Sequence, residues 1–240
     1  MKLLLACLLS AAAAAHADPE VLPTVTTALK RDGSALPYGR INELLSKLQQ
    51  HGEGLFRMDF KVDTAKTRVP LPDVRLAVRS DDADYPIKLD GEGGFALPVL
   101  PAAEAKTADL ATNVAKGQLS VQGTIELTVL PDQLTMAKVR QVMRVARTLR
   151  EELLPFYLRW LFPRIEGVRV CSDTPAWELE WRESGQLLGL PLPANERDPQ
   201  ARKGEKSRPC TLLTGQESWP DAARLLAPDG SKLSVKLQGT

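Results

Sequence analysis

The chain has 240 residues and a nearly balanced charge, with 31 lysines and arginines against 30 aspartates and glutamates. This balance argues against a general nucleic-acid-binding protein, because such proteins carry a clear excess of basic residues. The length suffices for one large or two small domains with a hydrophobic core, and no segment after residue 17 is apolar enough to span a membrane.

Residues 1–17 have the three-part pattern of a cleavable secretory signal. Lys2 supplies a positive charge, residues 3–15 form an apolar run, and Ala15-His16-Ala17 is a cleavage site of the A-x-A type. The apolar run is shorter than the ~20 residues needed to cross a bilayer, which argues against a membrane anchor. The sequence therefore predicts a periplasmic or secreted protein that begins at Asp18.

Cys7 leaves a second interpretation open, that of a lipoprotein. The run Leu4-Leu5-Ala6-Cys7 resembles a bacterial lipobox, in which the cysteine becomes the lipidated first residue. Most of the apolar core follows this cysteine instead of preceding it, and this order favours cleavage after Ala17.

Cleavage after residue 17 removes Cys7 and leaves Cys171 and Cys210. Two cysteines in an oxidising compartment are expected to form one disulfide. The disulfide would close a loop of about 40 residues, which the chain-entropy relation values at about 4 kcal/mol. Two free thiols or metal ligands are the alternatives.

Because His51 is then the single histidine and no C-x-x-C pair occurs, we expect no metal site and no cofactor.

The first section of the exported chain, residues 18–66, is predicted to contain one helix and one strand. Apolar residues recur at helical spacing at Ile41, Leu44, Leu45 and Leu48. Pro37 and Gly52 bound this helix. Residues 56–63 then alternate apolar and charged side chains, which is the pattern of a half-buried strand.

The next section, residues 67–131, consists of short apolar runs separated by turn-forming residues, and this pattern predicts a β-rich section. Asp90-Gly91 and Gly93-Gly94 tolerate positive φ. They predict a hairpin that joins a strand at 87–89 to a strand at 95–97.

Within this section, the segment YPIKLDGEGGFALP at 85–98 resembles the D-x-x-G-x-F-x-L-P turn of carboxypeptidase-regulatory or transthyretin-like β-sandwich modules. The resemblance covers at most residues 70–130. It implies a sandwich-like fold that serves in binding or scaffolding. Members of that family with hydrolase activity use histidines, and this segment has none, so the resemblance implies no catalytic residue.

Residues 132–163 are predicted to form a long helix followed by an aromatic segment. The helix is expected over 133–154, where Pro155 ends it. Its apolar face consists of Val139, Val142, Met143, Ala146, Leu149 and Leu153.

The polar side of this helix is a candidate anion-binding face, formed by Arg140, Arg144 and Arg147. Phosphate groups or the anionic surface of a membrane are the ligands that such a face suits. The alternative is an ordinary solvated face, because Arg147 and Glu151 have the i, i+4 spacing of an intrahelical ion pair.

The aromatic segment is a candidate surface for a partner or a membrane. Its large side chains surround one arginine and include Phe156, Tyr157, Arg159, Trp160 and Phe162. Tyrosine, tryptophan and arginine are the residue types that anchor such contacts. Core packing is the alternative explanation for so many apolar groups.

The last section, residues 164–240, has an α/β pattern and contains Cys171 and Cys210. Strands are expected at 177–181, 187–190 and 233–237, and a helix is expected to begin at Ser218-Trp219-Pro220 and to run through Leu226. No internal repeat is visible.

Trp177, Leu179 and Trp181 share one face of the first of these strands. The stripe suits either the core face of a sheet or a platform that stacks on sugars or peptides, and we favour the core. Glu178 and Glu180 then lie together on the opposite, solvated face.

The fold class expected from these patterns is α+β, with a β-rich sandwich-like middle section, one long amphipathic helix and a disulfide-stapled α/β C-terminal section. The sequence has no nucleotide-binding loop and no nucleophile elbow, so we assign no catalytic residue. We expect a non-catalytic binding or scaffolding protein of the cell envelope, with an envelope protein or polymer as partner. The alternatives are an envelope hydrolase that uses two carboxylates and an envelope-assembly accessory protein in peripheral contact with the membrane.

Overall fold

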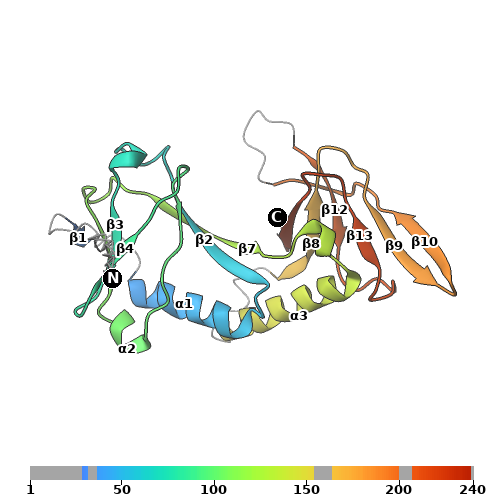
Figure 1. Ribbon diagram of the computed structural model, residues 1–240, viewed down its shortest axis with the longest axis horizontal. Helices are drawn as coiled ribbons and strands as arrows, with labels where there is room; N and C mark the ends of the chain where they lie inside the picture. The colour runs from blue at the N-terminus through green and yellow to red at the C-terminus, as the bar shows by residue number, and fades with distance from the viewer. Residues whose placement is uncertain (1–28, 32–36, 154–163, 200–206, 239–240) are drawn as a thin grey trace, which may run out of the picture.

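The computed structural model describes residues 29–31, 37–153, 164–199 and 207–238. They form two lobes that lie side by side, an N-terminal lobe from β1 to β7 and a C-terminal lobe from α3 to β14 (Figure 1). Helices and antiparallel sheets occur in the same chain, so the expected α+β class is confirmed. The predicted signal at 1–17 and the aromatic segment at 156–162 lie outside the described residues.

The N-terminal lobe has, in its described part, the elements β1 (Lys30–Arg31), α1 (Tyr38–His51), β2 (Phe56–Val62), β3 (Leu76–Arg79), β4 (Asp84–Ile87), β5 (Gly94–Phe95), α2 (Ala102–Ala105), β6 (Asp109–Thr112) and β7 (Val121–Leu127). One sheet has the order β1-β6-β3-β4 and the other has the order β5-β2-β7. The strand predicted at 56–63 is β2, which pairs along its whole length with β7.

A shared core joins the two sheets of this lobe. Phe60 of β2 stacks on Phe95 of β5 with 5.7 Å between ring centroids. Leu76 of β3 and Val74 before it are buried in the same cluster. Since apolar residues of both sheets and the apolar face of α1 pack together, the sandwich-like character expected for this part of the chain is confirmed.

The hairpin predicted around Asp90 is wrong in its pairing, although the turn itself forms. The Asp90 carboxylate accepts hydrogen bonds from the backbone N–H groups of Glu92 at 2.8 Å and Gly94 at 2.7 Å. The strands on either side of this turn separate, because β4 pairs with β3 whereas β5 pairs with β2. Local turn chemistry reverses the chain, but burial of Phe95 beside Phe60 decides which sheet the returning strand joins.

The helix predicted from the Ile41 pattern is α1, and two buried polar side chains position it. Asn42 donates to the carbonyl of Leu100 at 3.0 Å and accepts from the backbone N–H of Leu100 at 2.7 Å. Tyr38 is fully buried and donates to the carbonyl of Pro98, and its burial raises the pKa of the phenol. These bonds tie the start of α1 to the loop that follows β5.

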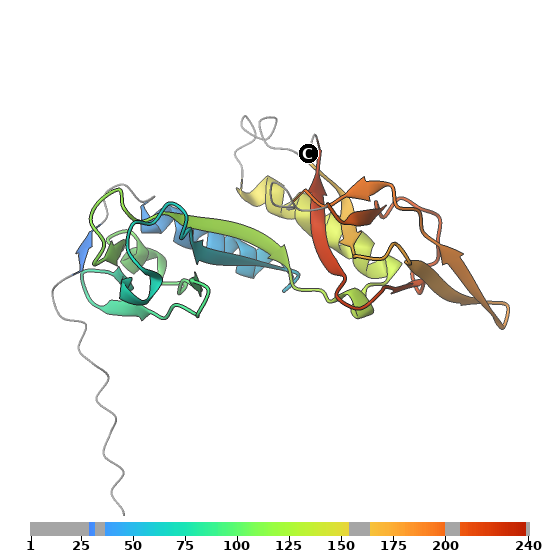
Figure 2. The ribbon, with the colours of Figure 1, turned by 90° about the horizontal axis from the view of Figure 1, so that it is seen from above.

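The C-terminal lobe has, in its described part, the elements α3 (Met136–Leu153), β8 (Ile165–Cys171), β9 (Glu178–Glu183), β10 (Gln186–Pro191), β11 (Glu196–Arg197), β12 (Pro209–Leu213), β13 (Arg224–Leu226) and β14 (Lys232–Leu237). Its sheets have the orders β11-β12-β8-β14 and β10-β9-β13. The hairpin of β9 and β10 projects from the end of the molecule farthest from the N-terminal lobe (Figure 2). Short 3-10 turns occur at Leu71–Asp73 and Pro131–Gln133.

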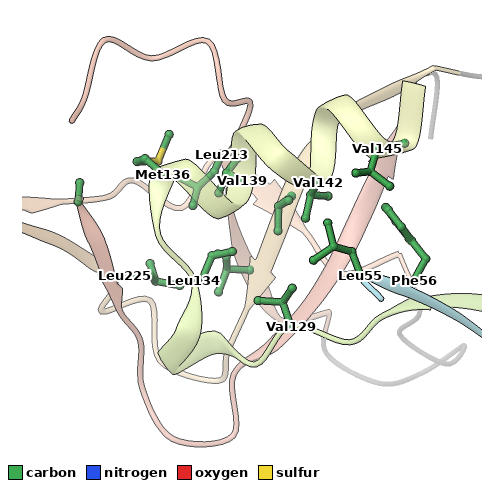
Figure 3. Close-up of a cluster of buried hydrophobic side chains, with 14 of the residues drawn as sticks. Leu55, Phe56, Val129, Leu134, Met136, Val139, Val142, Val145, Leu213 and Leu225 are labelled. Atoms are coloured by element: carbon green, nitrogen blue, oxygen red, sulfur yellow. The ribbon is translucent and has the colours of Figure 1, made fainter. Parts of the chain in front are cut away.

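The apolar face of α3 forms the largest core of the protein (Figure 3). Val139 and Val142 of the helix are fully buried, as are Val168 of β8 and Leu213 of β12. Burial of one such side chain stabilises the fold by about 1.5–3 kcal/mol. The same cluster contains Leu55 and Phe56 of the N-terminal lobe, so this core also holds the two lobes together.

The helix predicted from Ser218 to Leu226 is wrong, because this segment binds the start of α3 instead. The backbone N–H groups of Met136 and Ala137 donate to the carbonyls of Ala223 and Asp221 at 2.9 and 3.0 Å. These bonds satisfy two of the amide groups that every helix leaves unpaired in its first turn. The segment then continues as β13, with Leu225 buried in the core and paired with β9.

The stripe at Trp177, Leu179 and Trp181 faces the core, as we expected. Trp177 and Leu179 are each 1% exposed, and Trp181 packs partly buried against the same cluster. Glu178 on the opposite face is exposed. The strands expected at 187–190 and 233–237 are also present, as β10 and β14.

Cys171 and Cys210 form the expected disulfide, which joins β8 and β12 where the two residues lie directly opposite each other. Their Cα atoms are 4.1 Å apart and 39 positions apart in sequence. Cys210 also pairs with Glu196 of β11, so the disulfide fixes three neighbouring strands at one end of the sheet.

We predict that replacing both Cys171 and Cys210 by alanine lowers the free energy of unfolding by about 4 kcal/mol, since the unfolded chain regains the entropy of an open loop. Urea unfolding of the oxidised protein and of the variant measures the difference. Wild-type protein treated with a reductant is the control and should unfold with the variant. Unfolding of the variant at the wild-type midpoint would contradict the prediction.

Candidate functional site

A large groove runs between the two lobes of the described structure. Its volume is about 1630 Å³. The N-terminal lobe contributes one face of α1 and the edge strand β7, and the C-terminal lobe contributes the last turns of α3, the start of β8, and β14. Each wall therefore belongs to an element that the core described above holds in place.

The floor of the groove is apolar. Its side chains come from both lobes and include Leu44, Leu48, Phe56, Ile125, Met143, Leu149, Ile165 and Val235. Ile125 of β7 is 44% exposed, which is unusual for a large apolar residue beside a core. Gly123, two residues earlier on the same face, has no side chain, and the Met58 methyl and the Phe60 ring already occupy the space that a Cβ atom would take. The exposed apolar side chain on this part of β7 is therefore Ile125.

The rim of the groove carries charges of both signs. Its basic residues are Arg40, Lys47, Arg147, Arg150 and Arg164, and its acidic residues are Glu43, Glu151, Glu152 and Glu166. On the α1 side of the rim, Lys47 and Glu43 form an ion pair along the helix at 3.2 Å. A rim of mixed sign suits a ligand that itself carries both charges, and it does not suit a polyanion.

One wall of the groove is the unpaired edge of a β-strand. β7 pairs with β2 through all seven of its residues and lies at the end of its sheet. In the described part of the chain, no backbone hydrogen bond reaches its outer edge between Val121 and Leu127. Such an edge offers a row of N–H and C=O groups to another extended chain.

The register identifies which residues of β7 present these groups. Thr128 donates to the carbonyl of Leu55, and Asp63 donates to the carbonyl of Ser120, so these positions are hydrogen-bonded pairs of the ladder. Hydrogen-bonded and non-hydrogen-bonded pairs alternate in an antiparallel ladder. The outward N–H and C=O groups therefore belong to the residues of the non-hydrogen-bonded pairs, which are Val121, Gly123, Ile125 and Leu127.

Polar contacts between the lobes hold the walls of the groove at a defined separation. Glu53, which follows α1, accepts hydrogen bonds from Gln141 at 2.6 Å and from Arg144 at 3.1 Å, both on α3. The hydrogen bonds from Gln141 and Arg144 lower the pKa of the Glu53 carboxyl. Lys47 of α1 also donates to the carbonyl of Glu152 at the end of α3.

The three arginines of the candidate anion-binding face have separate roles in the structure. Arg140 forms an ion pair with Asp221 and donates to the carbonyls of Glu217 and Trp219 at 2.7 Å. Arg144 contacts Glu53, whereas Arg147 lines the groove. Two of the three guanidinium groups are therefore engaged in holding segments of the fold together.

The aromatic residues predicted as a partner surface, Phe156, Tyr157, Arg159, Trp160 and Phe162, lie outside the described residues. The described residues nearest to them along the chain, Leu153 and Arg164, both line the groove. Sequence patterns did not reveal the groove itself, because its walls come from segments that are up to about 200 residues apart.

The carboxylates whose pKa values are displaced do not resemble a general acid, which needs a raised pKa. Hydrogen bonds lower the pKa of Asp84, through Arg79, and that of Asp90, through the backbone of Gly94 and Glu92. Within the described ranges, no group of three or more histidine, cysteine, aspartate or glutamate side chains is arranged to hold a metal ion.

We compared the chain with protein families, curated proteins and solved structures. No protein-family model, curated protein or solved structure matches the chain. Among the described helices, none has the length and apolar character needed to cross a membrane.

We predict that Glu53→Gln slightly lowers the urea midpoint at neutral pH and that the difference disappears in acid. The pKa of Glu53 is lowered in the folded protein, so its contribution to stability is present above the unfolded value of about 4.3 and is lost as pH falls through the lowered folded value. Urea unfolding at about pH 7 and about pH 2 measures both differences. Glu183→Gln, at an exposed position on β9, is the matched control and should unfold like the wild type at either pH.

Proposed function

We propose that the protein is an exported, non-catalytic binding protein of the cell envelope whose groove binds an extended polypeptide segment. The observation that carries this proposal is the unpaired edge of β7, which opens onto an apolar groove between the lobes. Addition of a strand to an exposed sheet edge is a common mode of peptide recognition.

The backbone of β7 supplies the first part of the binding energy. Gly123 and Ile125 are the residues of β7 that line the groove, and an extended segment placed there receives hydrogen bonds from their outward N–H groups. Because these bonds involve only backbone groups, they favour an extended polypeptide of many sequences over a sugar or a lipid headgroup.

The side chains of the groove supply selectivity. Alternate side chains of a bound strand point to the same face as Ile125, toward Leu44 and Phe56 on the apolar floor. The others point toward solvent and the charged rim, where Lys47 and Glu166 offer partners of either sign. The preferred ligand is therefore a segment that alternates apolar residues with residues of both charges.

The test is a peptide-display selection on the exported form of the protein, residues 18–240, followed by titration of the selected peptides. Ile125→Pro removes one outward N–H of β7 and leaves the ladder bonds to β2 in place, because position 125 belongs to a non-hydrogen-bonded pair. Ile125→Val keeps the N–H and a branched apolar side chain, and it is the matched control.

We expect the selected peptides to bind the wild type and Ile125→Val with similar affinity and to bind Ile125→Pro at least about ten-fold more weakly, which corresponds to about 1.4 kcal/mol of lost hydrogen bonding. Fluorescence anisotropy measures the affinities, and circular dichroism verifies that each variant is folded. Equal binding to Ile125→Pro, or failure to select any peptide whose affinity depends on Ile125, overturns the proposal.

A further inference from the structure

A second recess lies on the C-terminal lobe, on the face of the sheet that α3 does not cover. Its volume is about 420 Å³, and Arg169, Glu196 and Arg197 are the charged residues in its lining. Arg169 belongs to the central strand β8, between Val168 and Val170, whose side chains point to the opposite face and into the core. The recess therefore lies between the central strand β8 and the edge strand β11 of this sheet.

The Arg169 side chain is almost completely buried, with 3% of its surface exposed. A guanidinium group has five N–H donors, and burial without partners is costly for each of them. The Nε atom of this group is buried and has no hydrogen-bond partner among the described residues. The nearest carboxylate oxygen, on Glu196, is 3.7 Å from a terminal nitrogen of Arg169.

Glu196 does not supply the missing hydrogen bond to Arg169, because its carboxylate is already bound to Lys236. Lys236 of β14 donates a hydrogen bond to Oε1 of Glu196 and lies 3.3 Å from Glu166. The hydrogen bond to Glu196, together with the one to Glu166, raises the pKa of the lysine. Lys236 thus has two carboxylate partners, whereas the one carboxylate near Arg169 among the described residues is Glu196, at 3.7 Å.

We infer that the recess binds a small oxyanion, a carboxylate or phosphate group, on the guanidinium of Arg169. The planar guanidinium can donate two parallel hydrogen bonds to either group, from Nε and a terminal nitrogen, and Nε is the donor that lacks a partner. Arg197 lines the same recess and adds a second positive charge. A volume of about 420 Å³ accommodates a small acid or the acidic end of a longer ligand.

The strands around Arg169 restrict the position of its backbone. The disulfide joins β8 to β12 two residues from Arg169, and Cys210 pairs with Glu196 on β11. Asn195 accepts a hydrogen bond from the backbone of Leu212 at 3.2 Å, which fixes the loop at the mouth of the recess. A preorganised guanidinium loses little entropy when an anion binds.

The test is calorimetric titration of the exported form of the protein with succinate and, separately, with inorganic phosphate, at constant ionic strength. Arg169→Met removes the charge, and Arg169→Lys keeps the charge but removes the planar fork. Arg182→Met changes an exposed arginine on β9 and is the matched control. The two titrations distinguish a carboxylate site from a phosphate site.

We expect saturable binding of at least one of the two anions by the wild type and by Arg182→Met. Affinity should fall at least ten-fold in Arg169→Lys, and binding should be lost in Arg169→Met. If the Arg169 variants do not fold, Arg197→Gln at the exposed side of the recess should weaken binding several-fold. Absence of saturable binding to the wild type, or equal binding by the Arg169 or Arg197 variants, overturns the proposal.

The result of the anion titrations does not depend on whether the groove binds a peptide. The peptide titrations depend on Ile125 of β7 and the anion titrations depend on Arg169 of β8, so either proposal can fail while the other stands.

Discussion

The packing of α3 is the interaction on which the rest of this structure depends. One stripe of the helix is buried against β8 and β12, and the same cluster receives Leu55 and Phe56 from the other lobe. Without this shared core, the lobes would be joined only by the chain after β7 and by exposed polar contacts such as Glu53 with Arg144. Because exposed ion pairs contribute little, the apolar contact sets the relative position of the lobes and hence the width of the groove.

The start of α3 shows how the two ends of the C-terminal lobe depend on each other. The first amides of the helix bind carbonyls of residues 221–223, and Arg140 binds Asp221 and the carbonyls of the preceding residues. The segment 218–226 has local signals for a helix of its own. Its backbone carbonyls instead accept hydrogen bonds from the unpaired N–H groups in the first turn of α3. Tertiary hydrogen bonds and burial of Leu225 outweigh a propensity that amounts to about 1 kcal/mol for a cap.

The two candidate sites differ in physical character. The groove combines an apolar floor, a mixed rim and an unpaired strand edge, and each of these features favours association with a polypeptide. The recess at Arg169 is small and contains a buried cation whose Nε donor has no partner among the described residues. Burial of a guanidinium group is costly in free energy, so such a residue is a candidate for a role in binding.

The sequence by itself determined the features that depend on local patterns. Alternation at 56–63 specified β2, and the apolar period at 139–149 specified α3. The two cysteines outside the predicted signal specified one disulfide. Each of these signals lies in neighbouring residues or in a simple count. Only the tertiary structure decided the partner of β5, the strand at 224–226, the free edge of β7 and the burial of Arg169. These depend on which distant segments meet, and pairing and burial between such segments leave no periodic trace in the sequence.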